Sequence, residues 1–260
     1  MSIAEMTRSI RVAQAASNNA IWCDTIGRAQ GSAGELHEHC WVQRCPAPRF
    51  YPNIVTRSAV ALAEQLRAVQ DLIEEGLLPG FAAKDSFATL DLKPLGLDLL
   101  FEASWIWRDS AQPQPAVAAR DLRWAIVQTA AELADWEDAW AGDPEAEMPQ
   151  PRVFLPALLA DPTLRFIGAS RGKQIVAGGI ANRTGAVVGI SNVFVRAGDV
   201  TSSWASCIAM AMAAFPGLPL VGYERGEAFI LAQQLGFKAI GPLRVWAYTS
   251  HIAERGAEQD

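Results

Sequence analysis

Residues 164–196 read LRFIGASRGKQIVAGGIANRTGAVVGISNVFVR, and this stretch decides the fold. It holds three runs rich in Ile, Val and Phe, separated by turns that contain Gly172 and Gly185, a residue type that supplies the positive φ of tight turns. The pair Gly178 and Gly179 inside the second run indicates a bulge or a close approach of another backbone. The pattern predicts a meander of three antiparallel strands, at residues 164–170, 174–181 and 186–195.

Helical patterns and shorter strands surround the meander. Trp204, Ile208 and Phe215 recur at the 3.6-residue period and predict a helix that ends at Pro216. Three further elements are expected after it, a strand at 218–222, a helix at 227–235 and a last strand pair at 239–248. Upstream, the sequence predicts a strand at 122–127, a helix begun by the capping box of Thr129 and Glu132, and a short helix at 154–160.

This order of elements, with AFILAQQLGF at residues 228–237, resembles the acyl-CoA-binding half of the GNAT superfamily of N-acetyltransferases. The resemblance covers residues 122–248. It implies an α/β (α+β) fold with a mixed, mostly antiparallel sheet flanked by helices. It also implies an acyl-CoA-dependent N-acyltransferase, in which a primary amine of a small molecule or protein attacks acetyl-CoA directly.

The first part of the chain is expected to form a domain of its own. The polar, proline-containing residues 109–115 separate an N-terminal α/β domain at 1–112 from a GNAT-like domain at 116–250. The phrases at Leu95 and Leu235, each Leu-Gly followed by an apolar strand, raise the hypothesis that the first domain is a degenerate copy of the second. Within it we predict strands at 21–26, 40–44, 86–92 and 97–107, and a helix at 58–75 capped by Ser58.

Composition limits the partners. The chain has 260 residues, half of them hydrophobic, and a net charge of −6. Nucleic acid and anionic membranes are not expected to bind, because no basic patch is available to neutralise phosphates. The first residues lack a signal-peptide pattern and the four cysteines are scattered, so we expect a cytoplasmic protein, a monomer or homodimer, with reduced thiols.

In the family, the strand that corresponds to residues 191–195 splays away from its neighbour, here residues 218–222. The exposed backbone amides then hold the pantetheine arm and polarise the thioester carbonyl. The resemblance therefore places cofactor contacts along one segment, at Asn192, Val193, Phe194 and Val195.

The pyrophosphate of CoA normally lies on the turn that opens the next helix. The matching residues that suit a phosphate are Arg196, Gly198, Thr201 and Ser202. Asp199 has the wrong charge for this role, and the usual glycine spacing is missing. An alternative is that Asp199 or Thr201 only caps the helix.

Two residues are candidates for proton transfer. Many family members have a proton-donating tyrosine where this chain has Ala232, so another group is required. Tyr223 could protonate the departing thiolate, and Glu224 could take a proton from the amine, because both follow the strand at 218–222. The alternative is that both are surface loop residues.

His37, His39, Cys40 and Cys45 are metal-ligand residue types, but their spacing matches no recurring zinc pattern, and we assign no metal. Two other functions stay open. One is a non-catalytic GNAT-like module that binds CoA, another ligand or a protein. The other is transfer from a different acyl carrier.

Overall fold

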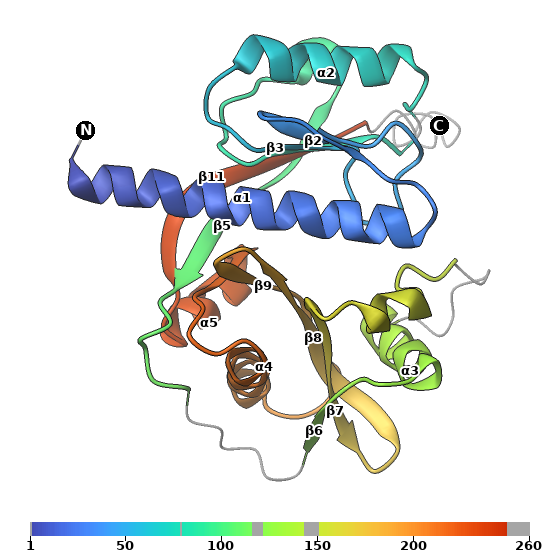
Figure 1. The fold of residues 1–260 in the computed structure, drawn as a ribbon, viewed down its shortest axis with the longest axis vertical. Helices are drawn as coiled ribbons and strands as arrows, with labels where there is room; N and C mark the ends of the chain where they lie inside the picture. The colour runs from blue at the N-terminus through green and yellow to red at the C-terminus, as the bar shows by residue number, and fades with distance from the viewer. Residues whose placement is uncertain (1, 79, 116–121, 143–150, 249–260) are drawn as a thin grey trace, which may run out of the picture.

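The structure, a computed structural model, describes residues 2–78, 80–115, 122–142 and 151–248 (Figure 1). In these residues no helix is long and apolar enough to cross a membrane. The α-helices are α1 (Ile3–Ala29), α2 (Leu62–Glu74), α3 (Ala130–Ala141), α4 (Val200–Ala214) and α5 (Gly226–Gln234). Short 3-10 helices are η1 (Lys93–Leu95) and η2 (Pro156–Ala160).

The described strands form one continuous sheet. They are β1 (Glu35–Leu36), β2 (Cys40–Val42), β3 (Ile54–Thr56), β4 (Ala82–Asp85), β5 (Asp98–Arg108), β6 (Arg123–Ile126), β7 (Leu164–Arg171), β8 (Gln174–Thr184), β9 (Val187–Val195), β10 (Leu220–Glu224) and β11 (Lys238–Ala247). Their order is β1-β2-β3-β4-β11-β5-β10-β9-β8-β7-β6. Neighbours are antiparallel except β3 with β4 and β9 with β10, so the predicted mixed, mostly antiparallel sheet is confirmed.

The two halves of the chain exchange strands. β5, from the first half, lies between β10 and β11, while β11, from the end of the chain, lies between β4 and β5. The predicted boundary at residues 109–115 directly follows the end of β5. Strands from before and after this boundary belong to the same sheet. The division into domains at 1–112 and 116–250 stays a prediction, and so does the repeat hypothesis. Residues 116–121 and 249–250 of the second predicted domain lie outside the described residues.

Helix α1 lies between the two halves of the sheet (Figure 1). It contacts β8 and β9 on one side and β2, β3 and β11 on the other. Ser2 and Glu5 form a reciprocal capping box at its start. The strand predicted at residues 21–26 is wrong, because this segment is the last part of α1. Trp22, Cys23 and Ile26 are buried there between two layers, which gives the run its strand-like apolar character.

Other elements of the first half also differ from the prediction. α2 begins at Leu62 and not at Ser58, whose hydroxyl accepts from the amide of Val60 in a local turn. Residues 86–92 form no strand, because Asp85 folds them into a turn by accepting from the amide of Leu90 at 2.8 Å. The expected strand pair at 239–248 is the single strand β11, which pairs with β4 and β5 at once.

Two clusters hold the second half together. On one face of β7, β8 and β9, Trp136 of α3 is fully buried and packs edge-on against Phe154, Phe166 and Phe194 at 5.2 to 5.4 Å between ring centres. Its indole Nε1 donates to the carbonyl of Ile167 at 2.8 Å. On the other face lie α4 and α5. The meander, α3 with its capping box, and α4 are confirmed.

Candidate active site between β9 and β10

Strands β9 and β10 pair only at their beginnings. Val188 is opposite Leu220 and Gly189 is opposite Val221, and after these positions no described strand pairs with that edge of β9. β10 continues along β5 on its other side as far as Glu224. The predicted separation of the two strands is therefore present, and it leaves backbone groups of β9 free to bind a ligand.

A β-bulge lies where the strands separate. Gly178 of β8 is opposite Phe194 and Ile180 is opposite Ser191, so β9 has one extra residue there. Asn192 takes the left-handed conformation, with φ of 53°. The bulge predicted from the two glycines is confirmed. A Cβ on Gly178 would lie 2.5 Å from the carbonyl of Ile167, so the backbones also approach closely.

The bulge changes which side chains face which layer. Ile190, before it, packs with the α4 cluster, and Phe194, four residues later, packs on Trp136 on the opposite face. Residues at even spacing on a regular strand would share a face. The extra residue therefore turns the backbone between Ser191 and Val193 toward the separation.

A cavity of about 290 Å³ opens at this point, beneath α1. β9 contributes Ser191, Asn192 and Val193, and β10 contributes Tyr223 and Glu224. The remaining lining residues used below come from α1, the loop before β3, β4 and β5, namely Asn18, Asn19, Trp22, Cys23, Tyr51, Lys84 and Trp105. The cavity is thus built by both halves of the chain.

Glu224 has the properties of a base. It is half-buried, and burial raises its pKa from 4.5 to about 7. No described residue donates a hydrogen bond to it or pairs with it. A carboxylate with a pKa near neutrality can accept a proton from an ammonium group under physiological conditions. Tyr223 and Glu224 are the last residues of β10, opposite Trp105 and Ser104, so the alternative that they are surface loop residues is wrong.

The hydroxyl of Tyr223 lies beside an ammonium group. Lys84 Nζ donates to it at 3.2 Å, and the same Nζ lies 4.3 Å from the centre of the Tyr223 ring. Trp105 packs edge-on against the ring at 5.6 Å. Because the tyrosine oxygen accepts from Lys84, its own proton remains available for another acceptor.

The residues predicted to hold the pyrophosphate lie outside the cavity, at the start of α4. The side chain of Arg196 contacts the C-terminal end of α3, where its Nε donates to the carbonyl of Ala139 at 2.6 Å. Asp199 is the N-cap of α4 and accepts from the amide of Ser202 at 2.6 Å, which lowers the pKa of its carboxyl. The capping alternative for Asp199 is confirmed. Its carboxylate occupies the position that suits an anion at a helix N-terminus.

The other predicted contacts separate into two groups. Phe194 and Val195 lie farther along β9, past the bulge and opposite Gly178 and Ala177 of β8. Gly198 and Thr201 lie in the turn into α4. Only Asn192 and Val193, of the predicted cofactor contacts, share the cavity with Tyr223 and Glu224. Ala232 of α5 is fully buried in the cluster under α4, so the proton donor must come from elsewhere.

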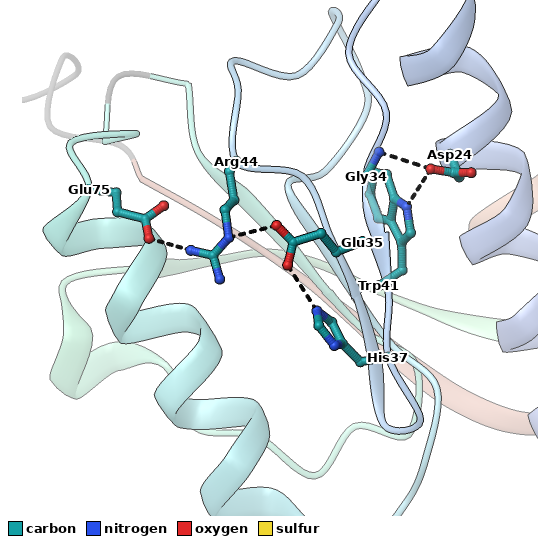
Figure 2. Close-up of polar contacts among 7 residues, drawn as sticks. All are labelled: Asp24, Gly34, Glu35, His37, Trp41, Arg44 and Glu75. Carbon is teal, nitrogen blue, oxygen red and sulfur yellow. Dashed lines mark hydrogen bonds and ion pairs between the residues drawn. The ribbon is translucent and has the colours of Figure 1, made fainter.

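The histidine segment forms a surface network of ion pairs (Figure 2). His37 Nε2 lies 3.2 Å from Glu35, and Arg44 joins Glu35 to Glu75. Asp24 of α1 anchors the preceding loop by accepting from the amide of Gly34 at 2.9 Å and from the indole of Trp41 at 3.1 Å. Across the part of the chain that the structure describes, no group of three or more metal-ligand side chains lies close enough to hold a metal ion.

Sequence reasoning missed the part of the site that α1 and β4 supply. Asn18 and Asn19 were overlooked because no helix was predicted at residues 3–20 and the end of α1 was predicted as a strand. The capping box of Ser2 and Glu5 was the available signal for this helix. Lys84 had no local signal, since its position in the cavity depends on the pairing of β4 with β11.

Comparisons with known proteins give the fold. No family model and no curated protein matches the chain. A GCN5-related N-acetyltransferase from Kribbella flavida superposes with a TM-score of 0.63 at 13% identity, over 98% of this chain and 99% of its own. One from Sphaerobacter thermophilus gives 0.53 at 12% identity, over 82% and 81%. A conserved protein of unknown function from Staphylococcus epidermidis ATCC 12228 gives 0.57 at 9%, over 82% and 91%. The chain has a divergent GNAT fold.

Proposed function

We propose that the protein is an acyl-CoA-dependent N-acyltransferase that transfers an acetyl group from acetyl-CoA to a primary amine. The observation that carries this proposal is the bulged, unpaired edge of β9 facing Glu224 in one cavity. The cavity lies beneath α1, which favours a small-molecule amine over a protein side chain. Compartment and oligomeric state, cytoplasmic and monomer or homodimer, remain expectations.

The chain would act on the two substrates in complementary ways. Acetyl-CoA supplies an activated acyl carbon as a thioester. Amides of the bulged segment at Asn192 and Val193 would donate to the thioester oxygen, where negative charge develops. Glu224 would remove a proton from the ammonium of the acceptor, so that the free amine attacks the carbonyl carbon. As the carbon–sulfur bond breaks, the hydroxyl of Tyr223 would protonate the thiolate, and the second proton lost by the amine nitrogen as the amide forms would pass to the Tyr223 oxygen and restore its hydroxyl.

Calorimetric titration with acetyl-CoA tests this function. Binding in the micromolar range, together with CoA release when an amine is added, is the expected result. No heat of binding at a ligand concentration of about 1 mM would exclude acetyl transfer from CoA, because typical KM values lie below that concentration. Transfer from another acyl carrier would then be the next reaction to assay.

A Tyr223→Phe variant is expected to lower turnover by about 10- to 100-fold, because it removes the proposed proton donor and keeps the ring packed against Trp105. Release of CoA thiol is the measurement. Tyr248→Phe is the matched control, since Tyr248 packs with the α2 cluster and should leave the rate unchanged. Full activity in Tyr223→Phe would remove this residue from the mechanism.

A specific observation also favours the non-catalytic alternative, because Asp199 and Arg196 are engaged within the chain. An Asp199→Asn variant keeps a capping side chain and removes the negative charge. We expect it to bind acetyl-CoA about three- to tenfold more tightly, because the N-terminus of α4 becomes available to phosphate. Thr129→Ala, which removes the cap of α3, is the control for loss of capping. Unchanged affinity in Asp199→Asn would place the pyrophosphate away from α4.

A further inference from the structure

Lys84 brings a positive charge into the cavity. It is only 5% exposed. Its Nζ donates to Asn19 Oδ1 at 2.9 Å and to the Tyr223 hydroxyl at 3.2 Å. Both partners are neutral, so they orient the ammonium group without balancing its charge. The third N–H of the group is not used by either contact.

Two titratable groups of the cavity, the Cys23 thiol and the Tyr51 hydroxyl, are uncharged at neutral pH. Burial raises the pKa of the Cys23 thiol to about 11, and burial also raises the pKa of the Tyr51 hydroxyl. Within the described ranges no carboxylate forms an ion pair with Lys84. Glu224 also lines the cavity, but the contacts of Lys84 Nζ are with Asn19 and Tyr223, and among the described residues no ion pair joins it to Glu224.

Such a cation is costly unless an anion joins it. Transfer of an ammonium group out of water is strongly unfavourable without a counter-charge. A second polar group of the cavity also lacks a partner, because the buried hydroxyl of Tyr51 makes no satisfactory hydrogen bond with any described residue. Lys84 is the single cationic side chain among the described residues that line the cavity. These features fit a ligand group with one negative charge, such as a carboxylate, better than a phosphate dianion.

We propose that Lys84 binds the carboxylate of the acceptor, and that the acceptor is a small amino acid. This inference rests on the proposed transfer to an amine, and it names the substrate class for that site. Glu224 would receive the ammonium end and Lys84 the carboxylate end of one zwitterion. The volume of about 290 Å³ limits the ligand to a small molecule, and Trp22 and Trp105 provide apolar surface for its side chain.

The test uses reaction products, which need no CoA to bind. N-acetylglycine, N-acetylalanine, N-acetylleucine and N-acetylphenylalanine are screened by thermal shift, and the acid that stabilises the protein most is titrated by calorimetry. Its carboxamide is titrated beside it. Because these probes have no ammonium group, the comparison isolates the carboxylate. We expect the acid to bind at least about tenfold more tightly than the amide, as a charge-assisted contact requires.

The variants are Lys84→Met, which keeps the length of the buried stem, and Lys238→Met, an exposed lysine of β11 as the matched control. Lys84→Met should lose at least about tenfold in affinity for the acid and nothing for the amide, and Lys238→Met should change neither. Equal binding of acid and amide to the natural protein, no stabilisation by any acid, or full affinity in a folded Lys84→Met would overturn the inference. The comparison of acid and amide on the natural protein tests for a carboxylate site even where Lys84→Met does not fold.

These outcomes are separable from those of the proposed function. Lys84-dependent binding of an acid without any binding of acetyl-CoA would keep the carboxylate site and exclude acetyl transfer from CoA. Binding and turnover of acetyl-CoA without preference for the acid would keep the transferase and exclude an amino acid acceptor.

Discussion

A Glu224→Gln variant is expected to lose about 10²- to 10⁴-fold in turnover, the usual contribution of a general base. Glutamine keeps the shape of the side chain and cannot take a proton. Burial raises the pKa of Glu224 to about 7, so turnover by the natural protein should rise about tenfold for each pH unit below 7 and level off above it. The variant should show no such rise. Steady-state CoA release, measured between about pH 5.5 and 8.5, gives both the loss of turnover in the variant and the pH dependence of turnover in the natural protein.

The same substitution should stabilise the protein. The pKa of Glu224 rises from 4.5 to about 7 on folding, so the folded state favours the protonated form. Below pH 4.5 both states are protonated and no free energy is lost. As the pH rises to 7, the unfolded chain ionises first and the free energy of unfolding falls, by about 3 kcal/mol at most. Glu224→Gln should remove this loss, so its gain in stability should be largest above pH 7 and vanish near pH 4.5.

The matched control is Glu227→Gln, an exposed carboxylate in the first turn of α5. It should change neither the pH profile nor the pH dependence of stability. Full turnover in Glu224→Gln would exclude the residue as the base. A variant that is less stable than the natural protein at pH 8 would show that Glu224 makes favourable interactions in the fold.

Replacing Trp136 with alanine is expected to lower the free energy of unfolding by about 3 to 5 kcal/mol, as for other fully buried aromatic residues. The side chain is 0% exposed, packs edge-on against Phe154, Phe166 and Phe194, and satisfies the carbonyl of Ile167. Its loss leaves a cavity and an unpaired carbonyl. Urea unfolding followed by circular dichroism measures the effect.

Trp140→Ala, one turn along α3, is the control. Trp140 is half-buried and packs on Phe154, so its loss should cost less than half as much. Because Trp136 also supports Phe194 just past the bulge, Trp136→Ala should weaken substrate binding as well. Equal destabilisation by the two variants would mean that Trp136 is not the centre of this cluster.

The local part of the fold could be predicted from the sequence. Gly172 and Gly185 bound the strands of the meander, and Gly178 and Gly179 mark the bulge, because turns and bulges depend on the conformation of a few residues. The exchange of β5 and β11 could not be predicted. The sequence of each strand does not indicate which strands pair with it, since pairing between distant segments leaves no local sequence pattern.

The same limit applied to the site. Tyr223 and Glu224 were identified because they directly follow the segment at 218–222 that was predicted to separate from the strand before it. Lys84 was not, since it enters the cavity only through the pairing of β4 with β11. Helix α1 was misread where layers on both sides bury Trp22 and Ile26, because burial on several faces weakens the helical period.

A crystal structure of the protein grown with acetyl-CoA tests most directly whether the separation of β9 from β10 is a thioester site. We expect the pantetheine arm along the unpaired edge of β9, with the carbonyl oxygen about 3 Å from a backbone amide at Asn192 or Val193. The acetyl group should face Glu224. Electron density for acetyl-CoA elsewhere on the protein, or a separation without ligand at about 5 mM acetyl-CoA, far above a typical KM, would contradict the proposed function.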